Sequence, residues 1–394
     1  MNDHPVFPVE LFAIIIGALA GDLETLRSCA LVSSTFYGLA RVFSHIRVGP
    51  QFNQEHNFVQ LCALLEGSPP FAARVESLRI CARGEEPNPR TWMLEADLGR
   101  CFPPLVSLTR LCIALDSGHL SWLTLSHANR HSIQAILPTL TCLELKGVTE
   151  LPLALLSHCS LLRSLTLDNV SFADSLGAAA DTDGCSNIHL RHIGLRLGAI
   201  SLVRFVDWVT DPESPFEISC LRSLGCIAYD PRSHPPIQRL LNASLGLQSL
   251  CIKNHSFTDK LHELDLRQLA HLRTLALDIY VSHWKTYNHE RLLLSLNNFV
   301  FPTPQQTKTA LILDIMSHDE PRRTDITQLL AGIDHILARL PFETVTIIVW
   351  ARYPEDERKD KLIDVRDEFV PAMPLLASKL GRTDRLRILE SIPV

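Results

Sequence analysis

The sequence lacks the residue spacings that mark metal or disulfide chemistry. Its 394 residues include 11 cysteines, an odd number, and no two of them are spaced C-x-x-C. Paired metal ligands and disulfide frameworks both leave such spacings. We therefore expect no metal and no cofactor, and we expect reduced cysteines that act as small buried apolar residues.

Motifs that bind phosphate or activate a nucleophile are also missing. The chain contains no G-x-x-x-x-G-K-[ST], no G-x-G-x-x-G and no G-x-S-x-G. His127 and His131 are spaced H-x-x-x-H but lack the glutamate and the third ligand of a zinc site. We interpret them, like His189 and His192, as surface histidines, and we expect no catalytic residues and no enzyme activity.

Charge is scarce, and so are long apolar runs. Charged residues make up 20% of the chain, and the formal net charge of −6 gives no basic field for nucleic acid. The most apolar run near the N-terminus, residues 12–20, is far shorter than the ~18 residues of a membrane span. Acidic residues flank this run where a signal peptide would be positive. We expect neither nucleic-acid nor membrane partners and a cytoplasmic or nuclear location, or both.

Leucine is the residue in excess. There are 66 leucines, or 17% of the chain, and apolar residues make up 46%. This composition can bury a large core, which excludes disorder. The length allows two or more domains or one long repeat array.

The leucines recur in a short cassette, L-x-x-L-x-L. It stands as VESLRI (75–80), LTRLCI (108–113), LTCLEL (140–145), LRSLTL (162–167), LRHIGL (190–195), LRSLGC (221–226), LQSLCI (247–252) and LRTLAL (272–277), with an echo FETVTI at 342–347. Successive units of the first eight are 22 to 33 residues apart, in or just above the ~20–29 residues typical of leucine-rich repeats. The wider gap before the echo leaves room for one weaker unit around Leu311 and Leu313.

The cassette has a physical reason. In a strand the two residues of L-x-L point to the same face, and one such unit cannot close a core alone. Segments such as 151–159 and 200–209 carry helical patterns between the cassettes. We predict an α/β fold, an irregular leucine-rich repeat solenoid with parallel strands on its concave side and helices on its convex side. A generic α/β domain with leucine-rich parallel strands is the alternative.

After residue 281 the cassette weakens. The patterns there predict strands at 310–315 and 344–350, a helix at 324–340 and a second helix from 362 to about 380. Such an alternation suits atypical terminal repeats that close the open end of an array.

The first 45 or so residues follow a helical period instead. Three apolar stripes predict three short helices: Leu11, Ile14, Ile15, Ala18 and Leu19; Leu23, Leu26, Ala30 and Leu31; and Phe36, Leu39, Ala40 and Phe43. A unit this small is marginal alone, so contacts with a partner or another domain must support it.

This segment resembles the F-box of fungal F-box proteins. Residues 7–11, FPVEL, match the opening Leu-Pro-x-Glu-Leu except at Phe7. Asp22-Leu23, the stretch CALVSSTF at 29–36, Leu39-Ala40 and a closing Ile-x-Val at 46–48 follow in the family's order, with His45 where many members carry Trp.

The resemblance implies a role as an adaptor-binding protein. F-box domains dock on Skp1, and through it on a cullin, in a cullin-RING ubiquitin ligase, while downstream repeats select the target. The positions implied to face the adaptor are Pro8, Leu11, Ile15, Leu31, Val32 and Phe36. The alternative is that these residues only form a helical core that caps the array, in an interaction scaffold with no ubiquitin-ligase role.

Four regions are expected. They are an F-box-like unit at 1–48, a joining region at 49–73, a leucine-rich repeat array at 74–280 and atypical terminal repeats at 281–394. Arg163, Arg222 and Arg273 lie between cassette leucines and are candidates for target binding, since arginine is enriched in interface cores. Solvated surface arginines are the alternative, and the sequence does not name the target.

Overall fold

The computed structural model describes two compact units of the chain. The described residues are 45–48, 54–82, 98–115, 118–173, 187–228, 230–254, 264–281, 293, 296, 309–317, 323–340, 342–350, 361–364, 369–380 and 385–392. Unit 1 spans residues 1–149 and 158–161, and unit 2 spans 150–157 and 162–394.

Unit 1 contains a row of parallel strands joined by helices. The strands are β1 (His45–Val48), β2 (Ser77–Ala82), β3 (Arg110–Leu115) and β5 (Cys142–Lys146), paired in that order. The short strands β4 (Leu120–Ser121) and β6 (Val148–Thr149) pair separately. The helices are α4 (Gln54–Gly67), α5 (Pro69–Ala72), α7 (Leu98–Cys101) and α8 (His127–Ile136), with the 3-10 turns η2 (Trp122–Thr124) and η3 (Leu137–Thr139).

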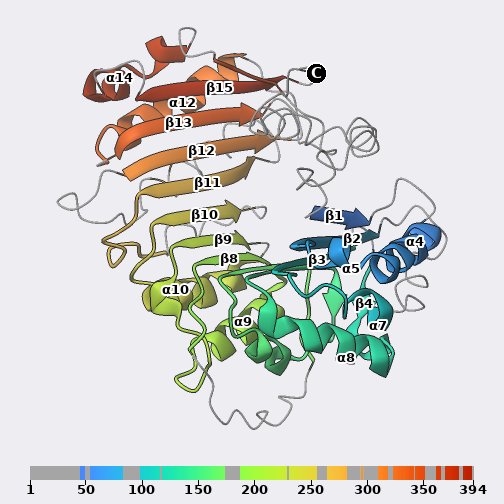
Figure 1. Cartoon of the computed structure of the whole chain (residues 1–394). Coiled ribbons are helices and arrows are strands. Elements are labelled where there is room, and N and C mark those ends of the chain that lie inside the picture. The colour runs from blue at the N-terminus through green and yellow to red at the C-terminus, as the bar shows by residue number, and fades with distance from the viewer. Residues whose placement is uncertain are drawn as a thin grey trace, which may run out of the picture. The chain divides into compact units, whose positions relative to one another are not determined.

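Unit 2 continues the same strand–crossover pattern. Its parallel strands are β7 (Ser164–Asp168), β8 (His192–Arg196), β9 (Ser223–Ala228), β10 (Ser249–Asn254), β11 (Thr274–Val281), β12 (Thr309–Ser317), β13 (Phe342–Trp350) and β15 (Leu386–Ile392). Figure 1 shows β8 to β13 as arrows that point the same way. The strand β14 (Lys361–Asp364) pairs antiparallel with β15.

Helices lie in several of the crossover connections that parallel pairing requires in unit 2. They are α9 (Ala199–Val209), α10 (His234–Ala243), α12 (Arg323–Leu337) and α14 (Pro374–Leu380), with the 3-10 turns η5 (Ile218–Cys220), η6 (Pro231–Ser233) and η8 (Val370–Ala372). A further 3-10 segment, η4 (Leu153–His158), crosses the sequence boundary between the units. None of the described helices is long and apolar enough to cross a membrane.

The cassette leucines stand in register across the strands of unit 2. Two aligned rows run from β7 to β13: Leu165, Ile193, Leu224, Leu250, Leu275, Leu311 and Val345, and then Leu167, Leu195, Cys226, Ile252, Leu277, Leu313 and Ile347. Every member is at most 3% exposed. Burying each such side chain stabilises the fold by roughly 1.5–3 kcal/mol, so these rows form the core.

The structure confirms the α/β class and the parallel strands. Each of the eight cassettes and the later echo ends in a strand, and Leu311 and Leu313 lie on β12. Two helix predictions are confirmed as α9 and α12, although α12 begins at Arg323, one residue before the expected start.

Two helix predictions are wrong. Residues 361–364 form strand β14 where a helix was expected to begin, and the α-helix described within the rest of the expected range is α14, which begins at Pro374. Proline has no N–H and fits only the first turn of a helix, so Pro374 can start α14 but cannot continue one from upstream. The pattern at 151–159 forms the 3-10 segment η4 instead of an α-helix.

The N-terminal predictions fall largely outside the described residues. Residues 1–44 and their three expected helices are not among them. Residues 45–48, placed at the end of the helical unit, form strand β1 and pair with β2 from His45↔Ser77 to Val48↔Ile80. The closing Ile-x-Val therefore belongs to the sheet, and the expected joining region contains α4 and α5.

The nine described cysteines form no disulfide bond with one another. Cys226 occupies a core position where other units carry Leu or Ile and is 2% exposed. Burial raises the pKa of the Cys226 thiol to about 12, and it does the same for Cys159. These two thiols are inert apolar packing groups near neutral pH.

Truncating one core leucine tests this packing. Leu250 is 0% exposed and aligned on both sides, so Leu250→Ala should lower the free energy of unfolding by about 2–5 kcal/mol. Leu245→Ala is the matched control because Leu245 is 53% exposed. Urea denaturation of both variants measures the difference, and equal losses would contradict the assignment of Leu250 to the core.

Candidate functional site

The outward face of β7 to β11 carries small side chains. Opposite the leucines lie two aligned rows: Thr166, Gly194, Gly225, Cys251 and Ala276, and then Ser164, His192, Ser223, Ser249 and Thr274. Except for the exposed His192, these residues are half-buried. A sheet face without bulky side chains lets a partner approach the backbone closely.

Most charged residues on this outward face are paired. In unit 2, Lys253 Nζ lies 2.6 Å from Asp278 Oδ2, and Arg196 Nε lies 3.5 Å from Asp168 Oδ1. In unit 1, Arg79 and Glu144 approach to 3.6 Å.

Two carboxyl groups meet on neighbouring strands. Asp278 is 3% exposed and aligns with Asp314 on β12 as well as with Lys253 on β10. Burial first, and then the charge and hydrogen bond of Asp278, raise the pKa of Asp314 from 3.8 to about 7, while Lys253 acts in the opposite direction. Lys253 therefore forms an ion pair with Asp278 and also lowers the pKa of Asp314 through its charge. Asp314 is partly protonated at neutral pH.

An uninterrupted backbone ladder runs just before the strands of unit 2. The carbonyl of Arg163 accepts hydrogen bonds from the N–H groups of Arg191 and His192 at 2.8 and 3.0 Å. The same double contact joins Arg191 to Arg222 and Ser223, Arg222 to Gln248 and Ser249, and Gln248 to Arg273 and Thr274. We call Arg163, Arg191, Arg222 and Arg273 the arginine row. In the backbone ladder, Gln248 lies between Arg222 and Arg273.

The arginine row is a concentrated positive charge. All four residues are exposed, and within the part of the chain that the structure describes none of their guanidinium groups forms an ion pair. Arg163, Arg191 and Arg222 are successive, and neighbouring strands lie only ~4.8 Å apart. Like charges on adjacent strands destabilise a sheet, so an anionic partner would relieve a cost that the folded chain carries.

The structure places the predicted target-binding residues on one row but corrects their position. Arg163, Arg222 and Arg273 each lie one residue before a strand, at the strand edge, and not on the outward face between the two strand leucines. Arg191 is a fourth member that was missed. The signal was present, because LRHIGL carries Arg at the same cassette position as LRSLTL. The six expected adaptor-binding residues lie outside the described residues.

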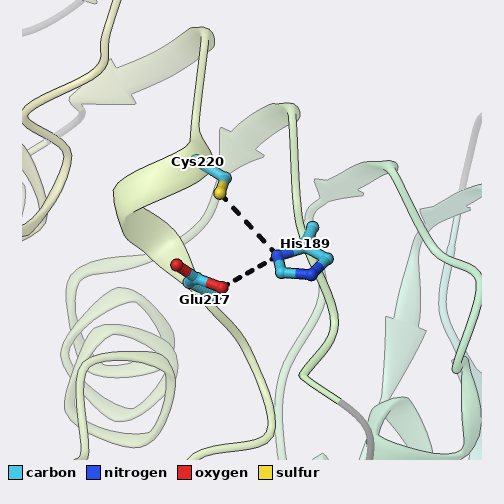
Figure 2. A group of neighbouring side chains, drawn as sticks. All are labelled: His189, Glu217 and Cys220. Carbon is cyan, nitrogen blue, oxygen red and sulfur yellow. Dashed lines mark hydrogen bonds and ion pairs between the residues drawn. The ribbon is translucent and has the colours of Figure 1, made fainter.

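Histidines are placed in two different settings. His127 and His131 are exposed on α8 with ring centroids 6.5 Å apart, as surface histidines should be. His189 is also exposed, as a surface histidine should be, and it meets Glu217 and Cys220 in a group of three possible metal ligands (Figure 2). Two signals could have found it: the E-x-x-C spacing at 217–220, and the 31-residue step from His189 to Cys220, which equals one cassette step.

Neither a protein-family model nor a curated protein matches this chain.

The raised pKa of Asp314 predicts a pH-dependent stability. The folded chain keeps a proton on Asp314 that the unfolded chain loses above pH 3.8, so stability should fall as pH rises toward about 7. Asp314→Asn keeps the size of the side chain and removes this titration. Its melting temperature should exceed that of the wild type at about pH 8 and match it more closely at about pH 4.

The exposed Asp207 provides the control for this measurement. Asp207→Asn should shift the melting temperature little at either pH, because exposed ion pairs contribute at most about 1 kcal/mol. A wild-type and an Asp314→Asn curve that stay parallel across the pH range would contradict the raised pKa.

Proposed function

We propose that this protein is a non-catalytic substrate receptor of a cullin-RING ubiquitin ligase. In this proposal the parallel strands are successive units of a leucine-rich repeat solenoid. The N-terminal F-box-like segment binds a Skp1-type adaptor, and the repeat surface binds the target. Scaffolding is the whole mechanism, since it holds the target near the transferred ubiquitin.

One observation carries the binding half of the proposal. The arginine row places four exposed guanidinium groups on one backbone ladder, in which Gln248 links Arg222 to Arg273, and none of the four has an ion-pair partner among the described residues. Guanidinium groups bind carboxylates with paired, charge-assisted hydrogen bonds. The target segment is therefore acidic. The fixed spacing of the row suits an extended chain laid across the strands.

The adaptor half rests on the N-terminal sequence. The order of FPVEL, Asp22-Leu23 and CALVSSTF supports an F-box, as does the excess of apolar residues in so short a segment. Strand β1 adds a structural consequence: an F-box-like unit would lead straight into the sheet through residues 45–48.

Adaptor binding is tested with the full chain and purified Skp1. The wild-type chain should be retained by immobilised Skp1, and Leu31→Asp should abolish retention because a charge cannot enter an apolar interface without a large penalty. Leu161→Asp is the control, since Leu161 is 55% exposed and outside the F-box-like segment.

Circular dichroism must show that all three chains are folded. Absence of Skp1 binding by a folded wild-type chain would overturn the ligase role and favour an interaction scaffold without one. Unfolding by Leu31→Asp would contradict a separate N-terminal module.

Target chemistry is tested with a fluorescent peptide of ten glutamates, compared with ten glutamines. The wild-type chain should bind the glutamate peptide, and binding should weaken as salt is added. The double variant Arg191→Glu/Arg222→Glu should weaken it by at least about tenfold, since the loss of one charged hydrogen bond costs about 1.5–3 kcal/mol. Fluorescence anisotropy gives the affinities.

Arg232→Glu is the matched charge reversal. Arg232 is exposed, lies outside the arginine row and is already paired with Asp230 at 2.6 Å. It should leave the affinity nearly unchanged. Equal effects of the two charge reversals would show a general electrostatic attraction and would contradict a built site.

A further inference from the structure

We propose that His189, Glu217 and Cys220 bind one zinc ion, with water as the fourth ligand. The three side chains offer one nitrogen, one oxygen and one sulfur atom, all within 4.8 Å of one another. Zinc accepts these ligand types together, and sites with three protein ligands leave a fourth position for water.

Two of the three distances between ligand atoms are close to those around a tetrahedral ion. His189 Nδ1 lies 2.8 Å from Glu217 Oε2 and 3.7 Å from Cys220 Sγ. Zinc bonds of 2.0–2.3 Å place tetrahedral ligands about 3.3–3.7 Å apart. The nitrogen–sulfur distance therefore already fits, and the carboxylate must withdraw by roughly half an ångström. Figure 2 shows both contacts meeting at the same ring nitrogen.

Hydrogen bonds hold the backbone segments that carry the three ligands next to each other. Glu217 precedes the turn η5 and Cys220 ends it, so the two side chains are three residues apart on one 3-10 turn, where such positions eclipse. Ile188, next to His189, donates its N–H to Pro215 O at 2.7 Å and accepts the N–H of Glu217 at 2.9 Å. Zinc would therefore find its three ligands already gathered.

A second hydrogen bond orients the carboxylate. Ser219 Oγ donates to Glu217 Oε1 at 2.9 Å, which leaves Oε2 directed at His189. Partners of this kind behind a metal ligand fix its orientation and raise metal affinity. The side chains of His189 and Glu217 are 53% and 38% exposed, so solvent can deliver the ion and supply the water.

The site would fasten two successive cassettes together. His189 and Cys220 directly precede the buried Leu190 and Leu221, which are equivalent positions one repeat apart. The neighbouring equivalents are Leu161 and Gly246, neither of which can ligate a metal, so the site is confined to this one step. Binding takes the thiolate of Cys220 and releases its proton, so affinity should fall as pH is lowered.

Cobalt(II) is the probe, because a thiolate bound to cobalt gives a charge-transfer absorption in the near ultraviolet. Titration of the full reduced chain should produce this band with one equivalent, and zinc should displace it. Cys220→Ser should abolish the band, and His189→Gln should weaken cobalt binding at least about tenfold. Equilibrium dialysis with zinc alone should show one ion fewer per chain in both variants.

Cys142→Ser and His131→Gln are the controls, being a partly exposed cysteine and an exposed histidine outside the group. Both should keep the band and the zinc stoichiometry. A wild-type chain without the band, or a band that survives Cys220→Ser, would overturn the proposal. The three residues would then be an ion pair with a neighbouring thiol.

Discussion

Burial of aligned aliphatic side chains is the interaction on which the rest of the structure depends. Leucines and their substitutes sit one above another on successive parallel strands, each at most 3% exposed. A shift of a strand by one residue would turn its leucines to solvent, so the core fixes the register throughout. Cys226 obeys the same constraint, because at this buried position its thiol stays protonated and packs as an apolar group.

A fixed register makes equivalent positions into neighbours. From β7 to β13, residues 25 to 36 apart in sequence come within one strand spacing, so a side-chain type that recurs at one cassette position forms a row along the sheet. The arginine row arises in this way from the second cassette position. The ion pair of Lys253 with Asp278, and the meeting of Asp278 with Asp314, arise from the position after the last leucine. The group of His189, Glu217 and Cys220 spans a single step of the same ladder.

The cassette strands were predictable because an L-x-L pattern with a buried face has only one strand orientation that hides both leucines. The C-terminal helix was not, because Leu362 and Ile363 fit an edge strand as well as a helix, and pairing with β15 decided between them. Three of the four row arginines could be selected from their cassette position. Arg191 could have been selected in the same way, because it holds the second position of the cassette LRHIGL.

The sequence by itself determined the fold class, the cassette strands and their buried leucines, because alternation with period two is a property of neighbouring residues. It also carries the F-box resemblance. Only the tertiary structure decided which polar residues meet. His189 lies 28 residues before Glu217, and the pairing of the buried residues Ile188 and Phe216 brings the two side chains together. The lack of acidic partners for the arginine row, within the part of the chain that is described, is likewise a property of the assembled sheet, since it depends on which acids reach each guanidinium group.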